Sequence, residues 1–227
     1  MTGFAGFEKA TLDFLRGLGA NNEKPWFDAH RGDYEAHFVV PAKAFVSAVA
    51  GPLAELAPEV NAEPRINGSI FRINRDIRFS KDKRPYKDHL DLWFWEGHRK
   101  GAVSGFFFRL TAERLILGAG AHLFDKDRLA AYRQAVVDPV KGEALRRALD
   151  ELAASGHGVQ GQHYAKLPRG FEAETEDQAR LLRHKALWPA IEEAHPTALS
   201  SAELVPYCAA KWREVAPLHR WLVDTLS

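Results

Sequence analysis

The sequence predicts an α+β protein, with a central antiparallel sheet over about residues 66–122 and helices before and after it. Three observations support this class. Apolar residues recur at helical spacing before residue 60, alternate with polar residues from 66 to 122, and then return to helical spacing. Helices gathered around one antiparallel sheet define the α+β class.

The N-terminal part predicts three helices. The first covers residues 7–18, whose apolar side chains share one face, and glycine and asparagine residues follow it. The second covers residues 25–40, because proline suits a first helical turn. The third covers residues 41–56, and we expect Pro52 and the preceding glycine to break or kink it.

The middle part predicts the sheet. Residues 71–79 and 90–95 each alternate between apolar and polar side chains, which is typical of strands, and they flank a loop of Lys, Asp and Pro. Residues 102–110 and 115–120, joined by Thr-Ala-Glu-Arg, predict an antiparallel hairpin.

The C-terminal part predicts helices again. They cover residues 125–137, 141–154, 175–187, 200–212 and 217–226. Between them, residues 156–161 form a predicted glycine-rich loop and residues 167–171 a short strand or turn.

Composition limits the class of protein. The chain has 227 residues, of which 46% are apolar, and we expect one domain over residues 1–227. The 31 basic and 30 acidic residues nearly cancel, so no global charge favours nucleic acid or membrane. We expect a cytoplasmic protein without a membrane span, because Cys208 has no disulfide partner, the N-terminus lacks a secretory signal, and apolar stretches fall short of roughly 20 residues.

The clearest functional signal is a cationic segment. Residues 72–88 hold seven bases and three acids, a net charge of +4, whereas the whole chain carries +1. On a strand, Arg72, Asp76 and Arg78 would project from one face, where arginine forks can bind phosphate or carboxylate. We therefore predict a site for an anionic, phosphate-bearing small molecule. Its predicted ligand-binding residues are Asn22, Arg72, Arg75, Arg78, Lys81, Lys83, Tyr86 and Arg169.

Whether the site is catalytic stays open. Asp76 is the best candidate for a general acid or base. No nucleophile motif occurs, and the six-residue spacing of His157 and His163 is no zinc pattern, so we predict no metal site. The sequence does not indicate a cofactor.

Two alternatives remain at this point. The basic loop can belong to a noncatalytic module that contacts a nucleic-acid backbone or an acidic protein, with a strong dependence of affinity on salt. The basic strand can also be a structural salt-bridge ladder that pairs with Asp91 and Glu96. The sequence does not indicate an oligomeric state.

The same segment carries a family resemblance. Residues 75–87, RDIRFSKDKRPYK, resemble the signature of a conserved bacterial and fungal family of uncharacterised proteins. The Asn-Asn at 21–22 and Trp-Phe at 26–27 resemble its early element, and residues 167–171 and 181–185 resemble its later Pro-Arg-Gly and Leu-Arg-x-Lys elements. The resemblance covers most of the chain and implies one domain, but no activity and no catalytic residue.

Overall fold

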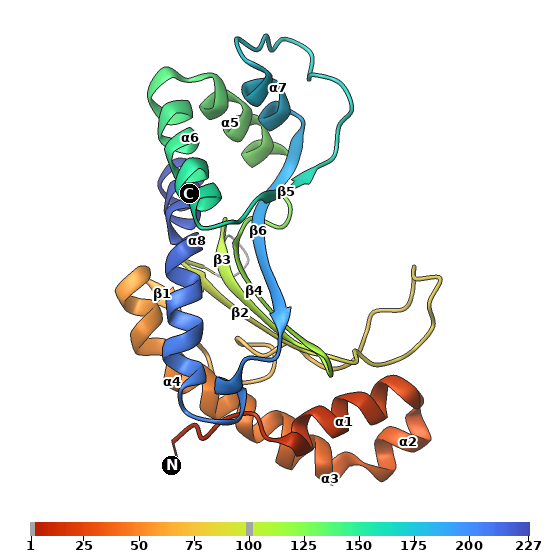
Figure 1. The fold of residues 1–227 in the computed structure, drawn as a ribbon. Coiled ribbons are helices and arrows are strands. Elements are labelled where there is room, and N and C mark those ends of the chain that lie inside the picture. Colours follow the sequence, from red (N-terminus) through yellow and green to blue (C-terminus); the bar gives the residue numbers. More distant parts are fainter. Residues whose placement is uncertain (1–2, 99–101) are drawn as a thin grey trace. The chain divides into compact units, whose positions relative to one another are not determined.

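The computed structural model describes residues 3–98 and 102–227 and has the α+β fold (Figure 1). Six strands form an antiparallel sheet in the order β1-β2-β3-β4-β6-β5. The strands are β1 (Val60–Asn61), β2 (Leu90–Glu96), β3 (Gly105–Leu110), β4 (Arg114–Gly120), β5 (Val159–Gln162) and β6 (His184–Ala194). The helices are α1 (Lys9–Ala20), α2 (Lys24–Ala29), α3 (Arg31–Asp33), η1 (Tyr34–Val39), α4 (Val40–Leu56), α5 (Lys126–Val137), α6 (Pro139–Ala154), α7 (Glu176–Leu182), η3 (Thr197–Ser200) and α8 (Leu204–Leu226).

The chain forms two compact units, each assembled from three separate segments. Unit one consists of Met1–Phe94, Phe107–Leu117 and Glu192–Ala210. Unit two consists of Trp95–Phe106, Gly118–Ile191 and Lys211–Ser227. The expectation of a single domain stays a prediction.

Aromatic side chains fill the core of unit one. The rings of Phe45 on α4 and Phe108 on β3 lie 4.9 Å apart, and Phe7 lies 5.5 Å from Phe45 and 5.8 Å from Phe108. All three are buried. Tilted rings at these distances bury large apolar areas, so this cluster fixes α4 on the sheet.

The predicted end of a helix before Pro41 is wrong, because the chain continues through a π-helical turn, η1, into α4. Proline has no N–H, so the carbonyl of His37 lacks its usual partner four residues on. The buried Thr11 hydroxyl of α1 donates to that carbonyl at 2.7 Å. A contact between helices thus replaces the missing hydrogen bond and lets the helix pass the proline.

Helix α4 also continues without interruption past Gly51 and Pro52. Pro52 removes one hydrogen bond near the end of the helix, while Val49 and Leu53 on either side are fully buried. By length and composition, the helical run Arg31–Leu56 could cross a membrane. Its buried residues indicate instead the core helix of a soluble domain, and a cytoplasmic location stays a prediction.

The strand predicted at residues 71–79 is wrong, because this segment is irregular. Phe71 N donates to Asp91 O at 3.1 Å, and Lys87 N donates to Ile73 O at 2.8 Å. Between these two bonds lie two residue steps in the segment (71 to 73) but four in its partner (87 to 91). The two chains therefore form no regular ladder here. The start of the segment lies beside β2, whereas Ile73 and Arg75 bond to Lys87 and Pro85, so the segment is not a strand of the sheet.

Two further predictions, both for the C-terminal part of the chain, are wrong. The helix predicted to reach residue 187 ends at Leu182, and β6 follows. Gly118 and Gly120 permit this strand, because a Cβ atom on either would lie 2.5 or 2.4 Å from a carbonyl oxygen of β6. The two predicted C-terminal helices are one helix, α8, with Pro217 inside it.

Candidate functional site

A loop in unit one, residues 75–85, carries most of the predicted site residues and extends beyond β2 (yellow in Figure 1). Asp76 accepts hydrogen bonds from Arg78, at 3.2 Å from its backbone N and at 3.0 and 2.6 Å from its guanidinium. Asp82 accepts in the same manner from Arg84, at 3.0 Å from its backbone N and 3.0 Å from its Nε. Aspartates that bond the backbone two residues on stabilise tight turns, so both carboxylates shape this loop.

Contacts across the loop close it. Arg75 donates from Nη1 to the Asp82 carboxylate at 2.8 Å and to the Arg84 carbonyl at 3.0 Å. Lys83 donates from Nζ to the Ile77 carbonyl at 3.0 Å. The arginine hydrogen bonds hold the pKa values of Asp76 and Asp82 below their ordinary range, so both are ionised at neutral pH.

The base of the loop is held by the segment between α1 and α2. The Asn22 side chain donates to the Tyr86 carbonyl and accepts from the Tyr86 N–H, each at 3.0 Å. The Tyr86 ring is buried and stacks on Phe27, with the ring centroids 4.4 Å apart. Asn22 and Tyr86, both predicted as ligand-binding residues, therefore contact each other, and these contacts anchor the loop.

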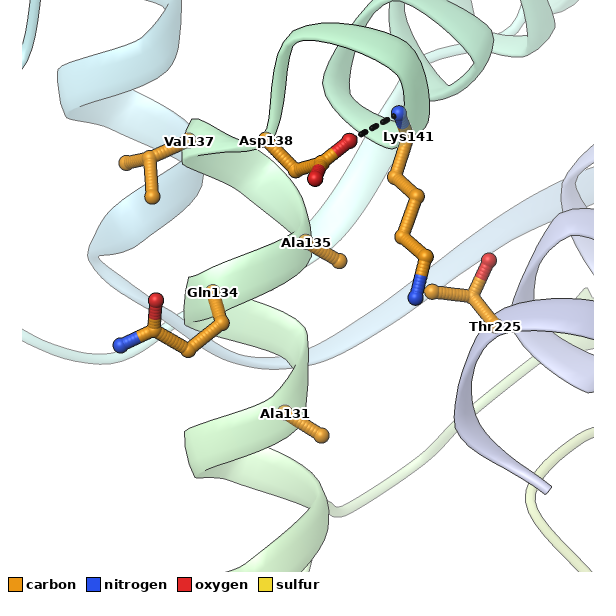
Figure 2. A pocket seen from close by; sticks show the side chains of 7 residues that line it. All are labelled: Ala131, Gln134, Ala135, Val137, Asp138, Lys141 and Thr225. Carbon is orange, nitrogen blue, oxygen red and sulfur yellow. Dashed lines mark hydrogen bonds between the residues drawn. The ribbon is translucent and has the colours of Figure 1, made fainter.

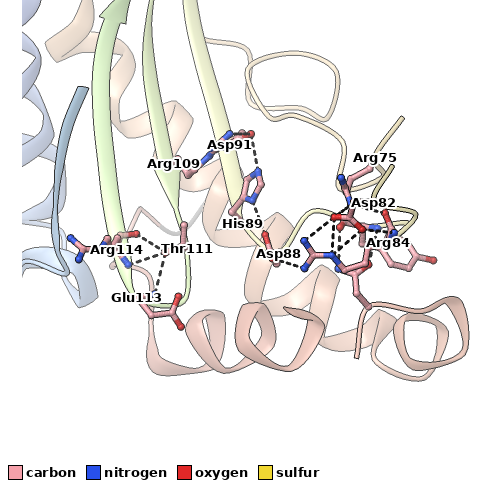
Figure 3. Close-up of polar contacts among 12 residues, drawn as sticks. Arg75, Asp82, Arg84, Asp88, His89, Asp91, Arg109, Thr111, Glu113 and Arg114 are labelled. Atoms are coloured by element: carbon pink, nitrogen blue, oxygen red, sulfur yellow. Dashed lines mark hydrogen bonds and ion pairs between the residues drawn. The ribbon is translucent and has the colours of Figure 1, made fainter. Parts of the chain in front are cut away.

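Beyond the loop, acidic and basic groups alternate into the sheet (Figure 3). Arg84 contacts Asp88 at 3.4 Å, and His89 contacts Asp88 at 2.9 Å and Asp91 at 3.3 Å. Arg109 binds both oxygens of the buried Asp91 carboxylate, at 2.6 and 3.0 Å. Burial alone would raise the pKa of Asp91, but the hydrogen bonds from His89 and Arg109 hold it below the ordinary value.

Lys87 feels the charges of both Arg72 and Arg109, and we call these three residues the cationic cluster. Partial burial lowers the pKa of Lys87. The charge of Asp91 opposes this shift, and the smaller effects of Arg109 and Arg72 add to it. The Lys87 ammonium also lies 4.8 Å from the centre of the Phe71 ring. Among the described residues, neither Arg72 nor Lys87 forms an ion pair.

The predicted row of Arg72, Asp76 and Arg78 on one strand face is wrong, because the segment is a loop and these side chains are exposed. The predicted ladder partners are also wrong. Asp91 pairs with Arg109 and His89, and Glu96 pairs with His219.

Two further predicted binding residues remain to be placed. Lys81 is exposed on the loop, and within residues 3–98 and 102–227 it has no ion pair. Arg169 belongs to unit two, in a turn beside Gly170, and its role in binding stays a prediction.

Sequence reasoning missed Lys87 and Arg109 as site residues. Arg109 lies on a predicted strand, where its polar side chain between apolar neighbours was the available signal. The pairing of β2 with β3 then brings it to Asp91.

Unit two contains a buried polar chain that the sequence did not indicate. Ser104 Oγ lies 2.8 Å from His219 Nδ1, and His219 Nε2 lies 3.2 Å from the Glu96 carboxylate. Burial lowers the pKa of His219 to about 4, with a smaller contribution from Arg220. The neutral ring satisfies both contacts, because Ser104 donates to Nδ1 and Nε2 donates to Glu96. Ser104 is only 1% exposed, so this arrangement is structural and not a nucleophile open to substrate.

Unit two also contains a hollow of about 490 Å³ between α5, the start of α6 and the end of α8. Figure 2 shows the Lys141 side chain extending toward Thr225. The Asp138 carboxylate accepts from the N–H groups of Val140 and Lys141 at 2.9 and 2.8 Å, so it caps α6. The hollow lacks the charge clustering found in unit one.

The fold and the loop define an α+β protein with a concentrated cationic surface. Residues 10–221 match the family described as "Conserved hypothetical protein (DUF2461)". The chain belongs to this family. No curated protein matches the chain.

Proposed function

We propose that the cationic cluster of Arg72, Lys87 and Arg109 binds an anionic, phosphate-bearing ligand. The observation that carries the proposal is the position of Lys87, which is half-buried over the Phe71 ring and feels the charges of Arg109 and Arg72. Partial burial and neighbouring positive charges both disfavour a charged ammonium. A bound anion would reverse the electrostatic cost, and perturbed ionisable groups of this kind cluster at functional sites.

Asp91 favours the charged form of Lys87 more than either arginine disfavours it, but this acid is shared with other partners. Asp91 is already bound by Arg109 through both oxygens and by His89. Arg72 is exposed, so its planar fork is free to turn toward a phosphate in bidentate fashion. Lys81 on the adjoining loop adds a further cation.

The surroundings of Asp76 do not favour catalysis by this residue. Its carboxylate is exposed and bound by Arg78, and its low pKa makes it a poor base at neutral pH. The proposal is therefore binding, without a reaction step.

The test is thermal unfolding of the wild type, Arg72→Gln and Lys87→Gln with phosphate, pyrophosphate, nucleotides and sugar phosphates. A ligand that binds only the folded state raises the unfolding midpoint. Lys43→Gln is the matched control, because it removes the same charge from an exposed position on α4. Sulfate controls for general salt stabilisation.

We expect at least one phosphate compound to raise the midpoint of the wild type and of Lys43→Gln, with a much smaller shift for Lys87→Gln and Arg72→Gln. Equal shifts in all four proteins would contradict the proposal, as would a panel in which no compound exceeds sulfate.

A further inference from the structure

The side chain at the centre of the loop is the starting observation. Phe79 is 96% exposed, although a large aromatic ring normally contributes to a core. It follows Arg78, whose guanidinium carbon lies 5.9 Å from the centre of the ring. The loop thus presents an aromatic face and a positive charge to solvent together.

The loop holds this pair in place. Asp76 binds Arg78 through its backbone and its guanidinium, and Lys83 ties itself to the carbonyl of Ile77, so the chain on the N-terminal side of Phe79 is fixed from two directions. On the C-terminal side, Lys81 is exposed and Arg75 braces Asp82. The ring is therefore displayed by a braced loop.

We infer that the phosphate-bearing ligand is a single-stranded nucleic acid, with a base stacked on Phe79 and backbone phosphates near Lys81 and the cationic cluster. This inference rests on the proposed function. Proteins that bind single strands combine basic grooves with aromatic side chains, because each base offers a face for stacking. A duplex keeps its base faces covered, so it lacks the group that Phe79 would contact.

An exposed ring among basic residues also resembles a membrane-binding loop, but the acidic residues oppose that alternative. Asp76 and Asp82 lie three residues on either side of Phe79 and are ionised. Insertion of Phe79 into a bilayer would bring both carboxylates toward apolar lipid, which is costly for a charged group. Stacking of a base leaves them in water.

The test measures binding of fluorescein-labelled twelve-nucleotide oligothymidine and oligouridine by fluorescence anisotropy. The proteins are the wild type, Phe79→Ala, Phe79→Trp and Lys87→Gln. Pyrophosphate binding by the same proteins, measured by calorimetry, reports the cationic cluster alone. Because Phe79 is almost fully exposed, Phe79→Ala leaves the core intact, and its thermal midpoint verifies this.

We expect Phe79→Ala to weaken oligonucleotide binding about tenfold, as for loss of one stacked base, and to leave pyrophosphate binding unchanged. Phe79→Trp should retain oligonucleotide binding, and Lys87→Gln should weaken the binding of both the oligonucleotide and pyrophosphate. The logarithm of affinity for the oligonucleotide should fall linearly with the logarithm of salt concentration.

Other results separate the two hypotheses. Equal oligonucleotide affinity for the wild type and Phe79→Ala, with intact pyrophosphate binding, overturns the stacking role and leaves the proposed function standing. Absence of pyrophosphate and oligonucleotide binding overturns both. Binding to phosphatidylserine vesicles that depends on Phe79, without oligonucleotide binding, overturns the inference in favour of a membrane surface.

Discussion

The loop at residues 75–85 in unit one and the Ser104–His219–Glu96 chain in unit two organise polar groups in opposite ways. In the loop, partners are near in sequence and stay in water, as in the Arg78–Asp76 pair, whose side chains are 76% and 46% exposed. In unit two, His219 is 1% exposed, and its partners lie 115 and 123 residues away. The contacts of the loop join residues close in sequence and are exposed to water, whereas those of unit two join distant residues that the tertiary fold brings together.

The two regions differ in what their polar groups do: those of the loop set its shape, and those of unit two support the stability of the fold. Exposed ion pairs contribute little to stability because water and salt screen them. A buried polar group contributes strongly, since loss of one partner leaves the other without water or a hydrogen bond. We therefore expect changes in the loop to affect binding, and changes to buried polar groups to affect folding.

The largest expected effect comes from Arg109→Ala. It leaves the Asp91 carboxylate, which is 7% exposed, without its bidentate partner. Breaking a buried pair from one side costs on the order of 3 kcal/mol in free energy of unfolding, as urea titration would measure. Asp91→Ala is the control and should cost less, because the Arg109 side chain is 35% exposed and reaches water. A larger loss for Asp91→Ala would contradict the account.

The pH dependence of stability tests the buried chain. The folded pKa of His219 lies near 4, below its ordinary value of 6.5, so the unfolded state binds the proton more readily. Stability from the neutral ring is complete above pH 6.5 and decreases as the pH falls toward 4, by about 3 kcal/mol. Urea titrations at several pH values should show a flatter dependence for His219→Gln than for the wild type. Equal dependence in both proteins would show that the fold does not lower the pKa of His219.

A smaller effect is expected from Asn22→Ala, which removes both hydrogen bonds to the Tyr86 backbone. Loss of two partly buried hydrogen bonds should lower the free energy of unfolding by about 1–2 kcal/mol. Asn21→Ala, which removes one exposed bond to the Gly17 carbonyl, is the comparison and should cost less. Hydrogen exchange should also accelerate in the loop for Asn22→Ala, and unchanged exchange would show that the loop does not depend on this anchor.

The smallest effect on stability is expected from Arg78→Ala. Both members of its ion pair with Asp76 are exposed, so the unfolding midpoint should match that of the wild type within experimental error. A sharp decrease in the midpoint would mean that the loop supports the fold, and would remove the distinction between the two regions.

The fold class and the cationic segment could be predicted from the sequence, because helical spacing and local charge are local properties. The strand at 71–79 could not be excluded, since its failure depends on the spacing of hydrogen bonds between Phe71 and Asp91 and between Lys87 and Ile73. Strand β6 was missed because its place beside β4 depends on close approach at Gly118 and Gly120.

The contacts of the predicted site residues could be foreseen only in part, for a similar reason. The basic residues of the loop follow one another in the chain, and several of them do lie together. Arg109 joins Asp91 only through the pairing of β2 and β3. The arginines that looked available are paired with Asp76 and Asp82, whereas Lys87 acquires its significance from burial.

The central claim is that the cationic cluster is a binding site for phosphate-bearing anions. The most direct measurement is an NMR titration of ¹³C-labelled lysine side chains with and without pyrophosphate, with Lys87 assigned through Lys87→Gln. We predict that the pKa of Lys87 lies below its ordinary value of 10.5 in the free protein and rises when pyrophosphate binds. A Lys87 pKa that is the same with and without pyrophosphate would contradict the claim.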